Sequence, residues 1–143
     1  MQELNFDEVL DALVARDKRY KREAYLFLRE ALDFTQKMMA KGPKEEMHHV
    51  TGQELLAGIR AFGLQQYGPM TLTVLGDWGV HACEDFGEIV FNMVECSLLA
   101  KTEKDTRADF KGAYTFNEAF QEPFLPKTRA RVEFVPEAKS TQV

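Results

Sequence analysis

Apolar residues recur at intervals of three and four along most of this chain, and this spacing predicts amphipathic helices. Two helices are expected in the N-terminal part. The first begins after Asn5, because asparagine is a residue type that caps helices. The second runs from about Lys18 to Ala40 and ends at Gly42-Pro43, a pair that stops helices.

Three more helical patterns follow in close succession. Thr51-Gly-Gln-Glu54 has the spacing of a capping box and introduces the first of them. The second covers residues 70–78 and is closed by Gly79 in a left-handed conformation. The third covers residues 83–99 and has the most continuous apolar stripe, so it is predicted to form the centre of the core.

After these helices the pattern changes to a polar, charged stretch and then to residues 113–116, which have the composition of a strand. Three helices followed by a strand are the order of a winged helix. We therefore expect one mainly helical domain of the α+β class, with two N-terminal helices packed on a winged-helix-like three-helix unit and a small β wing. The expected parts of the domain 1–136 are the helical region 1–42, the core 51–116 and an extension 117–136, followed by a disordered tail 137–143.

Length and charge narrow the class of protein. A chain of 143 residues can bury one core. Its net charge of -5 argues against a surface built entirely to coat nucleic acid. No secretion-type segment opens the chain, and its longest nearly uncharged run, 61–76, is interrupted by glycine and proline. The sequence therefore predicts a cytoplasmic protein with reduced thiols, no cofactor and no membrane span.

Several short segments carry a resemblance to a known family. They are His49-Val-Thr-Gly-Gln-Glu-Leu-Leu56, Tyr67-Gly-Pro-Met70, Trp78-Gly79, Asp85-Phe-Gly-Glu-Ile-Val-Phe-Asn92, Lys101-Thr102, Asp109-Phe110, and the cluster Tyr114, Phe116 and Phe120. In this order they resemble a family of small bacterial proteins restricted to planctomycete and verrucomicrobial lineages. The resemblance implies no activity, ligand or catalytic residue, because none is established for that family.

The charges of helix 83–99 indicate whether a winged helix in this chain would bind DNA or a protein. This helix would be the one that reads DNA, but four of the five polar residues between Glu84 and Glu95 are carboxylates that a phosphate backbone would repel. We therefore predict that it contacts a protein partner. The candidate contact residues on this helix are Glu84, Glu88, Asn92 and Glu95, with Asp85 as the fifth polar residue.

Three phenylalanines recur every four residues near the C-terminus. Phe116 and Phe120 are expected to fold over the helical core, as a small domain requires. Phe124 is a further candidate for partner contact, as an exposed aromatic side chain.

A basic run gives the alternative nucleic-acid interface. It consists of Arg16, Lys18, Arg19, Lys21 and Arg22, interrupted by Asp17, and it could join Lys127, Arg129 and Arg131. The competing interpretation is that this run is the solvated side of a helix.

Metal and catalytic chemistry have weaker signals. His81-Ala-Cys83, with His48, His49 and Cys96 elsewhere, has the residue types of a zinc site but only one closely spaced pair. Capping and core roles are favoured for these residues, so neither a metal nor a catalytic residue is predicted.

The sequence thus predicts a non-enzymatic protein-interaction or regulatory module. The second interpretation is a nucleic-acid- or ribosome-associated factor that binds through the basic run. A zinc-binding protein or an enzyme is the third.

Overall fold

The structure of the protein is a computed structural model that describes residues 5–40, 49–101 and 105–126. Within these residues the chain is mainly helical, and no β-strand occurs. The α-helices are α1 (Phe6–Arg16), α2 (Arg22–Met39), α3 (Gly52–Tyr67), α4 (Thr71–Asp77) and α5 (Cys83–Glu95). Short helical turns complete the described chain: η1 (Gly68–Met70), η2 (Arg107–Phe110), the π-helical turn η3 (Asn117–Gln121) and η4 (Glu122–Phe124).

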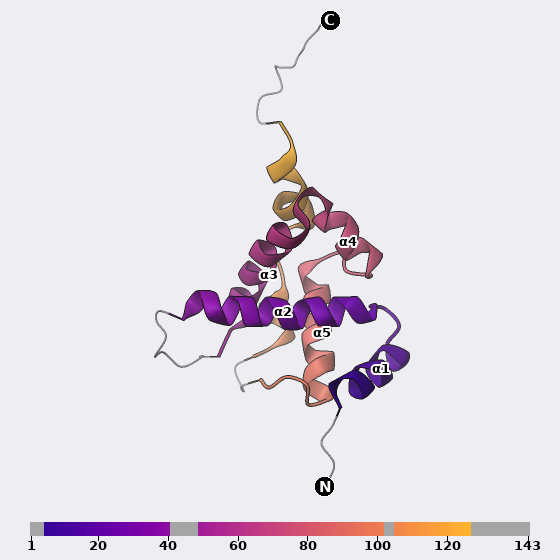
Figure 1. Cartoon of the computed structure of the whole chain (residues 1–143). Coiled ribbons are helices and arrows are strands. Elements are labelled where there is room, and N and C mark those ends of the chain that lie inside the picture. The colour runs from indigo at the N-terminus through magenta and orange to yellow at the C-terminus, as the bar shows by residue number, and fades with distance from the viewer. Residues whose placement is uncertain (1–4, 41–48, 102–104, 127–143) are drawn as a thin grey trace, which may run out of the picture.

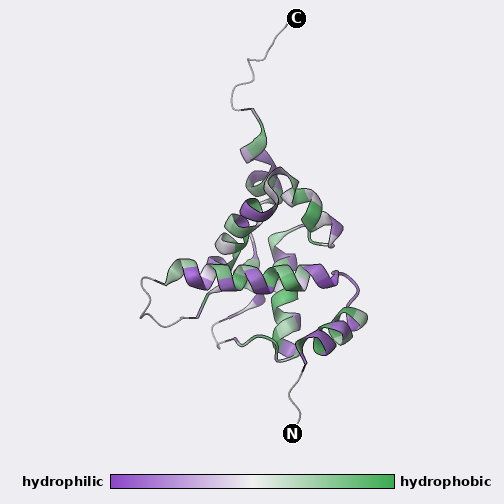
Figure 2. Ribbon diagram, viewed as in Figure 1, coloured by the Kyte–Doolittle hydropathy of each residue, from purple (hydrophilic) through white to green (hydrophobic). Residues whose placement is uncertain are grey.

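Helix α2 crosses α3 and α5, α1 lies beside one end of α5, and α4 packs against α3 and η3 (Figure 1). The helices meet around one apolar core, and α5 is predominantly hydrophobic, whereas α2 alternates between polar and apolar positions (Figure 2). The largest fully buried side chains are Tyr25, Phe86, Phe120, Leu10, Leu13, Leu28, Leu56, Ile59, Leu75, Ile89, Met93 and Val80. None of the described helices has the length and apolar character needed to cross a membrane.

Both predicted helix caps are confirmed. The side chain of Asn5 accepts hydrogen bonds from the backbone N–H groups of Asp7 and Glu8 at the start of α1. At the start of α3, Thr51 accepts from the backbone of Glu54 at 3.2 Å, and the carboxylate of Glu54 accepts from the backbone of Thr51 at 2.9 Å. These bonds satisfy N–H groups that a helix cannot pair internally.

Two glycines allow close approaches between elements. A Cβ atom at Gly58 would lie 1.7 Å from the Thr35 hydroxyl oxygen, so α3 and α2 touch closely where they cross. Gly79 has a φ of 92°, as predicted for the left-handed residue that follows α4. A Cβ atom there would lie 2.2 Å from the carbonyl oxygen of Arg19, so the turn after α4 packs directly on the turn between α1 and α2.

The prediction of a β wing, and with it a winged-helix arrangement, is not supported. Residues 105–116 form η2 and an irregular segment, and this segment is fixed by side chains: the Tyr114 hydroxyl donates to the Leu56 carbonyl at 2.8 Å, and Phe110 and Phe116 are buried among the helices. A strand requires a partner strand for its backbone groups, and the described residues provide none. The strand composition of 113–116 reflects aromatic packing.

Helix boundaries also differ from those predicted. Helix α2 begins at Arg22, four residues later than expected, because the Asp17 carboxylate accepts from the backbone N–H of Arg19 and so favours a turn. Helix α5 ends at Glu95, and Ser97, with a φ of 61°, takes the chain out of the helix. The part of the predicted extension after residue 126 and the predicted tail 137–143 lie outside the described residues.

Candidate functional site

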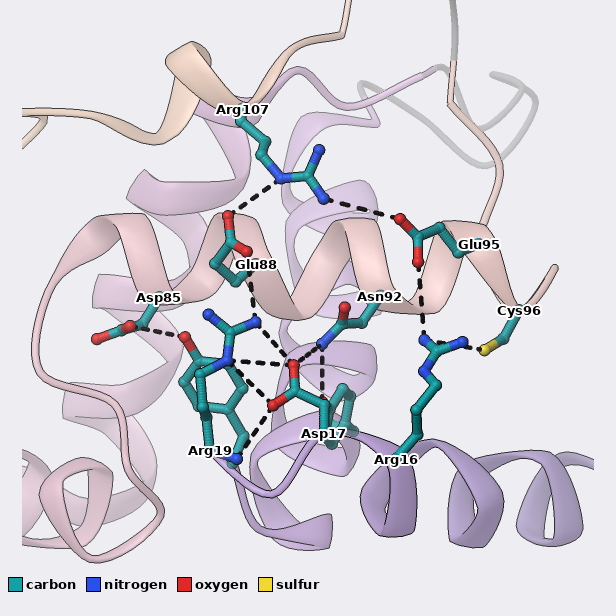
Figure 3. A network of polar contacts seen from close by, with 11 residues as sticks. Arg16, Asp17, Arg19, Asp85, Glu88, Asn92, Glu95, Cys96 and Arg107 are labelled. Atoms are coloured by element: carbon teal, nitrogen blue, oxygen red, sulfur yellow. Dashed lines mark hydrogen bonds and ion pairs between the residues drawn. The ribbon is translucent and has the colours of Figure 1, made fainter.

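The acidic face of α5 lies against arginines from two other parts of the chain (Figure 3). On one side of the helix, Arg16 pairs with Glu95 at 3.7 Å, and Arg19 pairs with Glu88 at 3.4 Å. On the other side, Arg107 from η2 pairs with Glu88 at 3.1 Å and with Glu95 at 3.8 Å. Thus the two predicted interfaces, basic and acidic, contact each other within one molecule.

Asp17 occupies the centre of this charge network. Two guanidinium nitrogens of Arg19 lie 2.7 and 3.0 Å from its oxygens, and the Asn92 amide donates to it at 2.9 Å. The hydrogen bonds from Arg19, followed by that from Asn92, hold the pKa of the Asp17 carboxyl well below its usual range, against the opposing effect of burial. Asp17 is therefore a charged anchor that fixes the α1–α2 turn to α5.

A second carboxylate connects the same turn to the start of α5. The Tyr20 hydroxyl donates to one oxygen of Asp85 at 2.7 Å. The other oxygen accepts from the backbone N–H groups of His81 and Ala82 at 2.8 and 3.1 Å, just before the helix begins. Burial, together with the hydrogen bond to Asp85, raises the pKa of Tyr20. Asp85 has a structural position, as a cap of α5 that also binds Tyr20.

The remaining cations of the basic run are also largely paired. Arg22 contacts Asp7 at 2.8 Å and Asp11 at 3.0 Å. Lys21 lies 3.5 Å from Asp77. Only Lys18 of this run makes no ion pair with the part of the chain that the structure describes. Exposed pairs are individually weak, but together they place a carboxylate beside most of the positive charges. Lys127, Arg129 and Arg131 lie outside the described residues.

The predicted partner-contact residues have different environments. Glu84 is exposed, whereas Glu88 and Glu95 belong to the charge network. Asn92 is only 7% exposed, and its amide donates to Asp17 and to the hydroxyl of Tyr25, so its prediction as a surface contact is wrong. On an isolated helix Asn92 would lie on the polar face and point to solvent. In the folded protein the α1–α2 turn covers this part of α5.

Phe124 is 45% exposed, whereas Phe116 and Phe120 are buried as predicted. Phe116 and Phe120 pack edge to face, with ring centroids 5.1 Å apart. Phe124 therefore keeps the surface position that a partner contact needs.

The weak metal candidates do not come together. Cys83 is buried, and its thiol donates to the Tyr114 carbonyl at 3.2 Å, while burial raises its pKa. The backbone of His81 binds Asp85, and His49 lies on another part of the surface, 2.7 Å from Asp105. Among the described residues, no group of three or more His, Cys, Asp or Glu side chains is arranged to hold a metal ion.

An apolar groove in the angle between α2 and α3 was not predicted. It has a volume of about 310 Å³ and is lined by Phe34, Thr35, Met38, Met39, Glu54, Ala57, Gly58 and Ala61. Met38 at its edge is 70% exposed, the largest value among the exposed large apolar side chains of the described residues. The sequence signal that could have revealed it is the group of small residues at helical spacing on α3, opposite Met38-Met39 on α2.

This groove adjoins a polar depression that shares Phe34 with it and is lined further by Leu26, Arg29, Glu30, Asp33, Lys37, Phe62 and Gln66. Both of its cations have contacts within the chain. Lys37 pairs with Asp33 at 2.9 Å, and the Arg29 guanidinium lies 4.2 Å from the ring centroid of Phe6. The α2–α3 groove, which comprises the apolar groove and this adjoining depression, therefore has an apolar end and an end of mixed charge.

Comparison with known proteins leaves these features to be interpreted from the structure alone. No family model, curated protein or solved structure matches the chain. Membership of the planctomycete and verrucomicrobial family stays a prediction.

Proposed function

We propose that this protein is a helical interaction module that binds an amphipathic helix of a protein partner in the α2–α3 groove. The observation that carries the proposal is the apolar end of the groove, where the exposed Met38 faces a floor that contains Ala57 and Ala61. Small residues on the floor leave room for a bulky apolar side chain of the partner. Methionine at the edge can adapt to its shape, because the side chain is unbranched and flexible.

The chemistry of the groove also defines the partner. Two helices that border an apolar groove suit a third helix, which inserts side chains spaced three and four residues apart. The adjoining depression carries charges of both signs, from Glu30 and Asp33 and from Arg29 and Lys37. A partner helix would place its apolar stripe in the apolar end, and polar residues beside that stripe would meet these mixed charges.

A nucleic-acid- or ribosome-associated function has less support. Binding to phosphates depends on cations that can exchange small counterions for the nucleic acid. Arg16, Arg19 and Arg22 would first have to leave carboxylates of their own chain. Among the described residues of the basic run, only Lys18 makes no ion pair, and one lysine provides too little positive charge for a binding face.

The test is affinity purification from the native cell with wild-type protein and two groove variants. Met38→Lys places a charge at the edge of the groove, and Ala61→Arg fills its floor. Met70→Lys is the matched control, because Met70 is 56% exposed on η1, outside the groove. We expect a protein that is recovered with the wild type and with Met70→Lys to be lost with both groove variants, under nuclease treatment.

Synthetic peptides that together cover the sequence of the captured protein are then tested for binding. The proposal requires a peptide that becomes helical on binding and that binds Ala61→Arg at least about tenfold more weakly, which corresponds to about 1.4 kcal/mol. Unfolding temperatures of the variants establish that the fold is intact. Equal recovery with all four proteins, or recovery that depends on nucleic acid, would contradict the proposal. Concentration-dependent dimerisation that Ala61→Arg abolishes would assign the groove to a second copy and would also overturn it.

A further inference from the structure

A separate cavity borders α2 at residues other than those that line the groove. It has a volume of about 320 Å³ and lies between α2, the start of α3, the end of α5 and η2. Its apolar walls come from Leu32, Val50, Leu55, Val90, Phe91, Leu98, Leu99 and Phe110. Leu32 and Gln36 of α2 face this cavity, whereas Phe34 and Met38 face the α2–α3 groove. The cavity and the groove are therefore separate features.

The polar groups of the cavity are few. His49 and Asp105 form an ion pair at 2.7 Å when the histidine is protonated, and a hydrogen bond when it is neutral. Lys101 and Asp105 both have interactions with other groups, so the charges at this site are engaged. The half-buried Gln36 side chain, in contrast, makes no hydrogen bond to the described residues. Its amide offers both a donor and an acceptor to whatever occupies the cavity.

These features define one class of ligand. Binding pockets for small molecules have volumes of about 300–1,000 Å³, mainly apolar walls and a few polar groups that orient the ligand. A charged ligand would lose its hydration against these apolar walls, and the charged residues of the cavity already have interactions of their own. We propose that the cavity binds a small, uncharged, apolar molecule with one hydroxyl group, which pairs with the Gln36 amide. This inference is independent of the α2–α3 groove.

The probe for this proposal is 2-naphthol, a compact two-ring alcohol, titrated into the full chain with methyl groups labelled for NMR. We expect saturable binding of one molecule per chain, with the largest shift changes at Leu32, Leu55 and Leu98. The carboxylate analogue 2-naphthoate should bind more weakly, because its charge would be placed against apolar walls. Absence of saturation, or shift changes centred on Ala57 and Ala61 in the groove, would overturn the assignment.

Two variants separate the cavity from nonspecific adsorption. Val90→Phe fills the cavity and should abolish binding of both 2-naphthol and naphthalene. Gln36→Leu removes the amide but keeps an apolar wall, so 2-naphthol affinity should fall about tenfold, the effect of one lost hydrogen bond, while naphthalene binding persists. Gln65→Leu, an identical change at an exposed position outside the cavity, should leave both affinities unchanged.

The Gln36→Leu measurement tests the proposal even if the larger substitution Val90→Phe prevents the protein from folding. Unfolding temperatures identify any variant that fails to fold. If 2-naphthol binds Gln36→Leu and Gln65→Leu with the same affinity, Gln36 does not orient the ligand and the proposal fails.

Discussion

At the scale of single residues, Asp17 has a larger role than its position suggests. In the sequence it is one carboxylate that interrupts a basic run. In the structure its side chain is 16% exposed and binds Arg19 from the same turn and Asn92 from α5. Both bonds favour the ionised carboxylate, so its pKa is lowered on folding. A group of this kind stabilises the folded state only while it is ionised.

We therefore predict that Asp17→Asn lowers the free energy of unfolding by about 1.5–3 kcal/mol at neutral pH, the range for hydrogen bonds to charged groups. The folded-state pKa lies below the ordinary aspartate value of about 3.9. The wild-type advantage is therefore complete above that value and shrinks as the pH falls toward the lower folded-state pKa. Urea unfolding at a series of pH values from neutral to strongly acidic measures this difference.

Asp33→Asn is the matched control, because Asp33 is 55% exposed and, in the part of the chain that the structure describes, its ion pair is with Lys37 four residues away. Its effect should be at most a few tenths of a kcal/mol. A difference between wild type and Asp17→Asn that stayed constant into acid would show that ionisation of Asp17 is not the source of its contribution.

At the scale of elements, the crossing of α2 and α3 positions both the groove and the core. Gly58 of α3 lies directly against Thr35 of α2, and the Thr35 hydroxyl donates to the carbonyl of Ala31 at 2.7 Å. Because a side chain at Gly58 has no space, the helices cannot keep this separation unless the residue is glycine. The geometry of the groove therefore depends on one missing methyl group.

Gly58→Ala should reduce the free energy of unfolding by about 1–3 kcal/mol, the usual effect of overpacking, although alanine favours helix. Gly76→Ala is the control in α4, where a Cβ atom would meet only His81 at 3.8 Å. There the substitution should be neutral or stabilise by up to about 1 kcal/mol. In a Thr35→Ala background, the loss at Gly58→Ala should become smaller. Chemical denaturation of the four variants tests this, and an equal effect at both glycines would contradict it.

The elements themselves could be predicted to a useful extent from the sequence. Helices α1, α3, α4 and α5 follow from caps and apolar spacing, since these signals are local. Local signals of this kind could not show whether the β wing forms. Aromatic composition at 113–116 predicts a strand, but whether a strand forms depends on a partner strand elsewhere in the chain. Tyr114 instead binds the carbonyl of Leu56, a contact between residues 58 positions apart.

At the scale of the whole molecule, the candidate sites were harder to predict than the helices. The positive and negative residues were recognised correctly as separate groups, but their mutual contact depends on how α1 and α5 pack. The pairs of Arg16 with Glu95 and Arg19 with Glu88 join residues far apart in the sequence. Such pairings have no periodic signal. The same limit applies to the α2–α3 groove, because its residues show no pattern until the two helices cross.

The packing of the whole molecule also determines its response to alkali. Burial is the largest cause of a raised pKa at Tyr20, Tyr25 and Tyr114. Between the ordinary tyrosine pKa of about 10 and these higher values, the folded state retains protons that the unfolded state has lost. The free energy of unfolding must therefore decrease as the pH rises through this range, while the contribution of the three phenols is complete below about pH 10.

The expected result for Tyr20→Phe is a loss of about 1 kcal/mol at neutral pH, because the hydrogen bond to Asp85 is removed. Its stability should then decrease less steeply than that of the wild type above about pH 10, because one titrating phenol is absent. Guanidinium unfolding of both proteins at matched pH values measures how steeply the free energy of unfolding of each decreases with pH. The lysines also titrate in this range, but they are the same in both proteins and so affect both alike. Parallel slopes would mean that Tyr20 ionises as readily in the folded protein as in the unfolded chain, and that its burial against α5 does not protect its proton.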